Sequence, residues 1–200
     1  MNLLYNPEVK KIGVLALQGA FIEHAHILRQ LGAEALEVRL PEELKGLDGL
    51  IIPGGESTTM SRLMRDFDLI PPLRKLAQQG FPILGTCAGM ILLGRGAYNP
   101  GLDTLRVMDI EVKRNAFGRQ VDSFETNLSI PTLGERPFHA IFIRAPVIEK
   151  FSPEVEILAK LKDSTVVGAK QGKLVALAFH PELTPDLRLH KYFLNLIEQG

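Results

Sequence analysis

The most reactive side chain in the sequence is its single cysteine, Cys87, which lies in the segment GTCAG at residues 85–89. An apolar run precedes this segment at residues 82–84, and another follows it at 90–93. The pattern predicts a strand, a tight turn and a helix, with the thiol at the apex of the turn. Glycines on both sides remove side chains that would clash there, and the helix N-terminus favours the thiolate. The segment therefore has the pattern of a nucleophile elbow with sulfur as the nucleophile.

A lone cysteine is more often a buried space-filler than a nucleophile, so a catalytic role also requires a base. His180 is the candidate base, because it follows an apolar strand predicted at residues 174–179 and precedes Pro181-Glu182. Pro181 disfavours a helical His180, and in an extended segment His180 and Glu182 project to the same side. The carboxylate can then orient one ring nitrogen while the other nitrogen faces the thiol. Both Cys87 and His180 follow strand ends, the edge where open α/β sheets place their sites.

The loop Pro53-Gly54-Gly55-Glu56-Ser57 also follows a predicted buried strand. Its adjacent glycines leave backbone N–H groups accessible to a ligand. One interpretation is an oxyanion hole that combines an N–H of Gly54 or Gly55 with that of Ala88. A phosphate-binding loop is a second interpretation, although the Gly-Lys-Ser/Thr signature is missing. A plain type II turn, which Pro-Gly favours, is a third.

Two arginines, Arg114 and Arg144, stand at the ends of predicted segments, where a planar guanidinium could bind a carboxylate. Taken singly, each is more typical of a solvated surface arginine. His24 and His26 lie two residues apart on a predicted helix and cannot share one face, so no metal site is predicted from them.

The elements that would position these residues alternate between strand and helix in the first half of the chain. Apolar runs predict buried strands at residues 12–17, 36–38, 50–52 and 82–84, and helices are predicted at 21–31, 57–65 and 69–79. In the first helix we expect Ile22, Ile27, Leu28 and Leu31 on or near the inner face, and Gly32 as the C-terminal cap. This alternation predicts right-handed crossovers and a parallel sheet.

The second half of the chain has a different pattern of short, β-rich segments separated by turns. Strands are predicted at residues 107–113, 120–125, 139–143, 155–161, 165–169 and 173–179, and a closing helix at 186–198. We therefore expect one α/β domain over residues 1–200, with a mixed, mostly parallel sheet flanked by helices and antiparallel strands added in the second half.

Composition excludes several classes of protein. The chain has 200 residues, 46% of them hydrophobic, which suffices for one substantial core. Lys+Arg and Asp+Glu both number 23, so overall charge gives no argument for binding nucleic acid or a membrane surface. No apolar run is long enough to span a bilayer, and the first residues lack the pattern of a secretory signal. One cysteine fits a reducing compartment, so we expect a cytoplasmic location.

As a set, these motifs resemble a known family. Residues 85–89 with 180–182 resemble the class I (triad) glutamine amidotransferases, which have a flavodoxin-like fold. Further stretches are similar to the glutaminase subunits of pyridoxal 5′-phosphate synthases: LQGAF at 17–21, PGGESTT at 53–59, RNAFGRQ at 114–120 and FIRAP at 142–146. The resemblance extends from about Lys11 to the C-terminus. Residues 1–10 lie outside it, and we expect them to form a loosely ordered extension.

The resemblance implies a glutaminase reaction. Cys87 would attack the amide carbon of L-glutamine, assisted by His180 that Glu182 orients, to release ammonia and form a thioester that water converts to glutamate. The positions that match the family's glutamine-binding residues are Gly55, Glu56, Ser57, Arg114, Ile143 and Arg144, and those that match its oxyanion region are Gly54, Gly55 and Ala88. The family uses no cofactor or metal in this subunit. Its ammonia passes to a partner synthase subunit, a (β/α)₈ barrel, in a large hetero-oligomer.

Three alternatives remain open at this point. A glutaminase that supplies another synthase, such as imidazole glycerol phosphate synthase, is the nearest, and residues 18–20 and 142–146 argue against it. A stand-alone flavodoxin-like cysteine hydrolase usually has its histidine close behind the cysteine, where Ala88 stands here. A non-catalytic regulatory module would not need an intact cysteine, histidine and glutamate.

Overall fold

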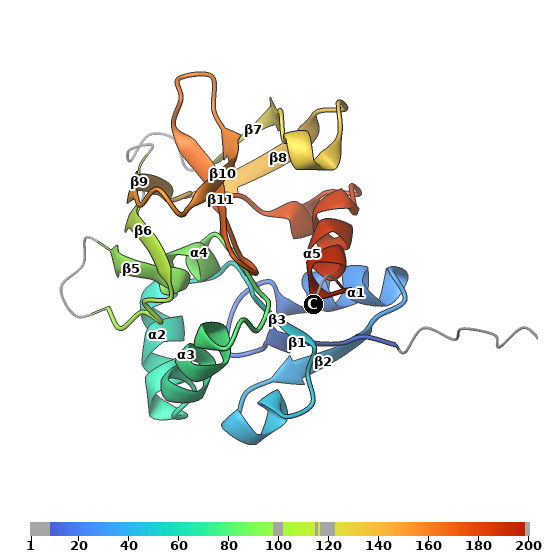
Figure 1. The fold of residues 1–200 in the computed structure, drawn as a ribbon, viewed down its shortest axis with the longest axis vertical. Coiled ribbons are helices and arrows are strands. Elements are labelled where there is room, and N and C mark those ends of the chain that lie inside the picture. The colour runs from blue at the N-terminus through green and yellow to red at the C-terminus, as the bar shows by residue number, and fades with distance from the viewer. Residues whose placement is uncertain (1–8, 98–101, 115, 117–122, 199–200) are drawn as a thin grey trace, which may run out of the picture.

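The computed structural model describes residues 9–97, 102–114, 116 and 123–198. Its main sheet has ten strands among these residues, in the order β2-β1-β3-β4-β12-β11-β9-β6-β5, with β10 paired to β11 (Figure 1). The strands at its parallel end are β1 (Lys11–Leu15), β2 (Glu34–Val38), β3 (Gly49–Ile52), β4 (Ile83–Thr86) and β12 (Leu174–Leu177). All of the neighbouring pairs among these five run parallel, as the alternating strand and helix segments predicted for β1 to β4. The strand predicted at 173–179 was expected among the antiparallel strands, but β12 pairs parallel with β4 and antiparallel with β11.

The centre of this parallel region is formed by β3, β4 and β12, whose residues are all buried. Their register decides which loops meet at the carboxyl edge. Ile52 pairs with Gly85, and Thr86 pairs with Leu177. The three strands therefore end side by side, and the segments after Ile52, Thr86 and Leu177 emerge at one edge of the sheet.

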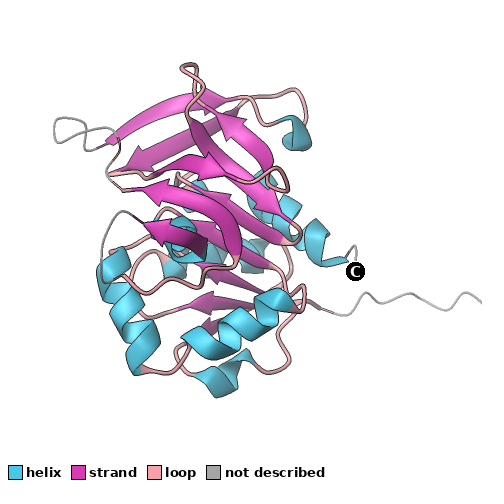
Figure 2. Cartoon of the chain, turned by 60° about the vertical axis from the view of Figure 1, so that its left-hand side comes forward, coloured by secondary structure: helices cyan, strands magenta, loops and turns pink. Residues whose placement is uncertain are grey.

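Helices cover both faces of the sheet (Figures 1 and 2). In Figure 1, α1 and α5 lie on one side of the parallel strands, and α2 and α3 lie on the other. The bounds of the helices are Phe21–Gln30 for α1, Ser57–Asp66 for α2, Ile70–Gln78 for α3, Ala88–Leu93 for α4 and Arg188–Glu198 for α5. The predicted helices are confirmed to within two residues at each end. Among the described residues, no helix has the length and apolarity needed to cross a membrane.

The predicted inner face of α1 is wrong at one position. Ile22 is 65% exposed, whereas His24 is completely buried, together with Leu28. The helix is rotated toward His24 because the imidazole finds polar partners in the interior, so a polar residue occupies a core position without an unpaired donor. Gly32 follows the helix with a φ of +82°, the left-handed conformation predicted for a C-terminal cap.

The second half of the chain adds the antiparallel part of the sheet, as predicted. The strands are β5 (Gly94–Ala97), β6 (Met108–Lys113), β9 (Val147–Phe151), β10 (Glu156–Lys160) and β11 (Val166–Gln171). The pairs β11–β12, β10–β11, β9–β11 and β6–β9 run antiparallel, whereas the edge strand β5 pairs parallel with β6. The sequence prediction missed β5, which contains two glycines, and β9, which follows a proline.

A separate antiparallel pair, β7 (Ser123–Leu128) and β8 (Phe138–Ile143), lies beyond the main sheet. Its inner face carries Phe138 and Phe142, whose rings contact that of Phe179. Residues 120–122 of the strand predicted at 120–125 lie outside the described residues, as do residues 1–8 of the predicted N-terminal extension.

The turn between β4 and α4 depends on two glycines that permit close backbone packing. A Cβ added at Gly85 would lie 2.6 Å from the carbonyl carbon of Gly89, and one added at Gly89 would lie 2.1 Å from the carbonyl oxygen of Ile52. No side chain fits at either distance. The glycine spacing of the sequence motif therefore brings α4 into direct contact with β3 and β4.

We predict that Gly89→Ala destabilises the protein, although alanine in a helix is ordinarily favoured over glycine by ~1 kcal/mol. The overlap with the Ile52 carbonyl should outweigh that gain and lower the free energy of unfolding by about 2 to 3 kcal/mol. Urea unfolding would measure it. Gly96→Ala is the matched control, because an added Cβ there meets no atom within 4 Å. Equal stability of Gly89→Ala and the wild type would contradict the packing argument.

Candidate active site

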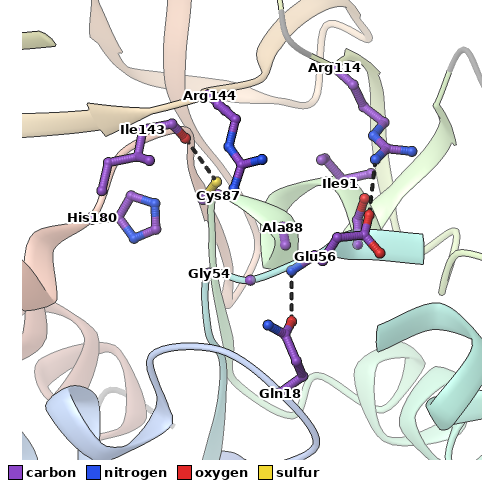
Figure 3. Close-up of a pocket in the computed structure, with 12 residues that line it drawn as sticks. Gln18, Gly54, Glu56, Cys87, Ala88, Ile91, Arg114, Ile143, Arg144 and His180 are labelled. Carbon is purple, nitrogen blue, oxygen red and sulfur yellow. Dashed lines mark hydrogen bonds and ion pairs between the residues drawn. The ribbon is translucent and has the colours of Figure 1, made fainter. Parts of the chain in front are cut away.

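Cys87 occupies the apex of the turn between β4 and α4. Its φ of +48° and ψ of −101° lie outside the regions that non-glycine residues normally adopt, and its N–H donates to the Leu177 carbonyl at 2.7 Å. The side chain is largely buried, and Sγ lies 3.8 Å from the Ile143 carbonyl oxygen, to which the thiol donates. The strained backbone turns the thiol into a cavity at the carboxyl edge of the sheet (Figure 3).

His180 lies three residues beyond the end of β12, the strand paired with β4. Nδ1 of its ring is 2.7 Å from Oε1 of Glu182, and the backbone N–H of His180 donates to the Ile141 carbonyl at 2.9 Å. Residues 181–183 form a 3₁₀ turn (η3, Pro181–Leu183), so the predicted extended conformation is wrong. The tight turn nevertheless brings the carboxylate to the ring, because it folds residue 182 back toward residue 180. The remaining ring nitrogen, Nε2, is free to face Cys87.

The protonation of His180 is set by opposing effects. Burial by itself lowers the pKa of the imidazole, whereas hydrogen bonds with Cys87 and Glu182, together with the negative charges of both, raise it to about 10. The imidazolium is therefore favoured at neutral pH. A histidine in this state can pair with a thiolate and can donate a proton to a leaving group.

The loop after β3 packs against the imidazole. A Cβ added at Gly54 would lie 2.3 Å from Cε1 of His180, so the backbone lies directly against the ring. The Gly54 carbonyl accepts a hydrogen bond from the Ala20 N–H at 3.0 Å. Gln18, at the end of the loop after β1, accepts from the Glu56 N–H at 2.7 Å through Oε1. The loop after β1 therefore holds the loop after β3 in place, and the latter contains the Gly54–Gly55 backbone that was predicted to contribute to an oxyanion hole.

Glu56 caps the N-terminus of α2. Its carboxylate accepts from the N–H groups of Thr58 and Thr59 at 3.1 and 2.7 Å, and it pairs with Arg114 at 3.2 Å. Partial burial raises the pKa of Glu56, but the hydrogen bonds from Thr59 and Thr58 outweigh it and lower the pKa to about 2. The carboxylate is therefore ionised at neutral pH and holds the Arg114 guanidinium at the cavity wall.

One cavity of about 310 Å³ collects almost all of the predicted site residues (Figure 3). Its volume lies in the range of small-molecule sites. The predicted residues that line it are Gly54, Gly55, Glu56, Ser57, Cys87, Ala88, Arg114, Ile143, Arg144 and His180. Glu182 is the exception, because it lies behind His180. Figure 3 shows His180 beside Cys87, and Arg114 beside Glu56 on the opposite side of the view.

Sequence reasoning missed two residues of the cavity wall, Gln18 and Ile91. Gln18 could have been found by the argument used for Cys87, because it follows a buried strand at the same edge of the sheet. Ile91 lies one helical turn after Cys87 on α4 and had no distinguishing signal. Reasoning from the residues also missed the buried His24 and His190, which lie behind Glu182.

Comparison with known proteins identifies the class of protein to which this fold and cavity belong. The chain belongs to the SNO glutamine amidotransferase family, whose model matches residues 14–199. A crystal structure of a glutamine amidotransferase superposes with a TM-score of 0.89 at 49% identity, covering 94% of this chain and 98% of that one. The resemblance found in the sequence motifs and the predicted fold class are confirmed.

Curated relatives with similar sequences carry the name of one particular member of this family. The pyridoxal 5′-phosphate synthase subunit PdxT of Herpetosiphon aurantiacus is 59% identical over 92% of this chain and 99% of its own length. The protein of the same name from Moorella thermoacetica is 57% identical over 94% of this chain and 99% of its own.

We predict that Glu56→Gln lowers the free energy of unfolding by about 1 kcal/mol at pH 7, because the helix loses its ionised cap. The Glu56 side chain is 49% exposed, so solvent screens the interaction and limits the gain. Its pKa is depressed, so the stabilisation is fully present above the ordinary value of 4.5 and is lost as the pH falls toward 2.

Urea unfolding of both proteins between pH 7 and pH 3 would measure this difference. Glu34→Gln is a suitable control, because Glu34 is exposed on β2, an edge strand. A stability difference for Glu56→Gln that persists unchanged at pH 3 would exclude the capping interpretation.

Proposed function

We propose that this chain is the glutaminase subunit of a pyridoxal 5′-phosphate synthase and that Cys87, His180 and Glu182 are its catalytic residues. One observation carries the assignment. The thiol and the imidazole line a single cavity, and the Glu182 carboxylate lies 2.7 Å from the far nitrogen of the imidazole. That is the order of nucleophile, base and orienting group that acyl transfer requires.

The reaction follows from these positions. The Cys87 thiolate attacks the amide carbon of L-glutamine, and Nε2 of the His180 imidazolium donates its proton to the departing nitrogen, which leaves as ammonia. The resulting γ-glutamyl thioester is attacked by water, which His180 deprotonates. The C–S bond then breaks, glutamate is released, and the Cys87 thiolate and the His180 imidazolium are restored. Water supplies the oxygen gained by glutamate, so the products are glutamate and ammonia.

Stabilisation of the tetrahedral intermediate is assigned to backbone donors. The Ala88 N–H opens α4 next to the nucleophile, and the Gly54–Gly55 peptide lies along the same cavity. The Gly54 carbonyl is bonded to the Ala20 N–H on one side. Because the N–H and C=O of a trans peptide point in opposite directions, the Gly55 N–H points away from Ala20. Such donors contribute on the order of 3 kcal/mol each to transition-state stabilisation.

The α-carboxylate and α-amino groups of glutamine have complementary partners in the cavity. Arg114 and Arg144 supply guanidinium groups for the carboxylate. Gly55, Glu56, Ser57 and Ile143 supply hydroxyl, carboxylate and backbone groups for the remaining polar atoms. Arg114 is held by Glu56 before substrate binds, which lowers the entropy cost of binding.

The need to transfer ammonia to an acceptor explains why a glutaminase would work as one subunit of a larger enzyme complex. Free ammonia is protonated at neutral pH and loses its nucleophilic electron pair, so it must reach its acceptor without equilibrating with bulk water. The relatives named above are each called a subunit of pyridoxal 5′-phosphate synthase. The partner we propose is a (β/α)₈-barrel synthase subunit, joined to this chain in a large cytoplasmic hetero-oligomer.

We predict that Cys87→Ala abolishes glutamine hydrolysis and that His180→Ala reduces it by about 100-fold or more, because the nucleophile and the general acid are lost. Glutamate and ammonia release would be measured with and without the partner synthase subunit. His139→Ala is the matched histidine control, because His139 is exposed on β8 and pairs with Glu125.

The same assay separates the alternatives. Equal activity of Cys87→Ala and wild type in every condition would remove the enzyme assignment. Full wild-type activity without a partner, unchanged when the partner is added, would favour a stand-alone hydrolase.

We predict that Arg144→Met raises the KM for glutamine by about tenfold or more with a smaller change in kcat, because a charged hydrogen bond to the substrate is lost. Steady-state kinetics of the assembled complex would measure both constants. Arg136→Met is the control, because Arg136 is exposed and pairs with Asp186 outside the cavity. An unchanged KM would remove Arg144 from the substrate site.

A further inference from the structure

Glu182 has a second buried contact that the proposed reaction does not use. Its Oε2 lies 3.3 Å from Nε2 of His24, and both side chains are completely buried. Oε2 has no hydrogen-bond partner of ordinary geometry among the described residues. A buried carboxylate oxygen without a donor is costly, and Nε2 of His24, at 3.3 Å, is the nitrogen that a small adjustment would make its donor. Catalytic hydrogen bonds are often long before substrate binds and tighten in the complex.

We propose that His24 is a positioning residue for glutamine hydrolysis, which holds Oε2 of Glu182 by donating from Nε2 and so fixes the carboxylate that orients His180. The proposal rests on the function proposed above, in which Glu182 orients the base. His24 does not line the cavity, so it acts on the reaction only through Glu182 and the strand that ends at Cys87.

The contacts of the two buried histidines determine their tautomers. An ionised Glu182 can only accept, so Nε2 of His24 carries the proton. Nδ1 of a neutral His24 is then an acceptor, and it lies 2.8 Å from Nε2 of His190. His190 therefore donates from Nε2, which leaves its buried Nδ1 as a lone pair without a partner. The opposite assignment would place a lone pair of His24 against the carboxylate and bury an unpaired N–H in His190.

The electrostatics require both histidines to be neutral. Burial, followed by the charges of His190 and His180, lowers the pKa of His24 well below its ordinary value, and burial lowers that of His190 to about 4. A second imidazolium beside Glu182 would compete with His180 for one negative charge. A neutral donor instead holds the carboxylate in place and leaves its charge to His180.

His24 also contacts the nucleophile strand. Its Nε2 lies 3.2 Å from Oγ1 of Thr86, the residue before Cys87, in hydrogen-bonding geometry. In the proposed arrangement the single Nε2 proton is therefore shared between Oγ1 of Thr86 and Oε2 of Glu182 as a three-centre hydrogen bond. One nitrogen atom on α1 therefore contacts both the strand that presents the thiol and the turn that presents the carboxylate. Cys87 and Glu182 are 95 residues apart in the sequence, and the pairing of β4 with β12 brings their segments together. The contact with His24 adds a side-chain link between the same two segments beyond the ends of these strands.

The kinetic test compares His24→Leu, which keeps the volume and removes the donor, with His24→Gln, whose amide can donate to Glu182. In the assembled complex we expect His24→Leu to lower kcat by about 10- to 100-fold with little change in KM. His24→Gln should be about fivefold or more faster than the leucine variant, which corresponds to one recovered hydrogen bond. His139→Leu serves as the matched control. An unchanged kcat in a folded His24→Leu protein would overturn the proposal.

A second measurement does not depend on the activity. Nitrogen-15 NMR of the full chain with labelled histidine, assigned by replacing each of the other four histidines in turn (His26, His139, His180 and His190), reports tautomer and charge. We expect His24 to be the neutral Nε2–H form between pH 6 and pH 8. A protonated His24, or the Nδ1–H tautomer, would overturn the proposal. Loss of activity in Cys87→Ala with normal kcat in His24→Leu would leave the function standing and remove only the positioning role.

Discussion

The close approach of α4 to the strands beneath it is the constraint on which the rest of the site depends. At Gly89 the helix backbone lies against the Ile52 carbonyl, and at Gly85 the strand lies against the helix. At this distance the chain turns from β4 into α4 at Cys87, which takes a positive φ that non-glycine residues rarely adopt. The parallel register of β3, β4 and β12 then places the Gly54 loop, the thiol and His180 around one cavity at the same edge of the sheet.

The electrostatic environment of the site gives its three buried histidines different charge states. His180 lies between a thiol and a carboxylate, and these two partners overcome the effect of burial, so the ring favours its charged form. Behind the carboxylate, His24 and His190 have the opposite character. Burial lowers the pKa of both, and the charges of His190 and His180 lower that of His24 further. Three histidines within one continuous network thus have two different charge states. The difference arises from which of them shares a hydrogen bond with the nucleophile.

The errors made from the sequence have specific physical causes. Ile22 was placed inside and is exposed, whereas His24 is buried. Residues 24, 28 and 31 share a helix face, but a polar residue is normally assigned to solvent unless a buried partner is known. The segment 180–182 was expected to be extended, but a 3₁₀ turn begins at Pro181, because proline restricts the backbone without choosing between the two. The strand β5 was missed, since its glycines carry no β-pattern and its pairing with β6 is tertiary.

The sequence by itself determined the family, the α/β class and the alternating strands and helices of the first half of the chain, because periodicity and glycine spacing are local properties. It also determined which residues would meet at the carboxyl edge, since strand ends in a parallel sheet converge there whatever the side chains. Only the tertiary structure decided the contacts behind that edge. His24, Glu182 and His190 come from α1, η3 and α5, and their hydrogen bonds depend on how two helices and a turn pack around one buried charge. No local pattern encodes that packing, because each partner is recognisable only from the position of the others.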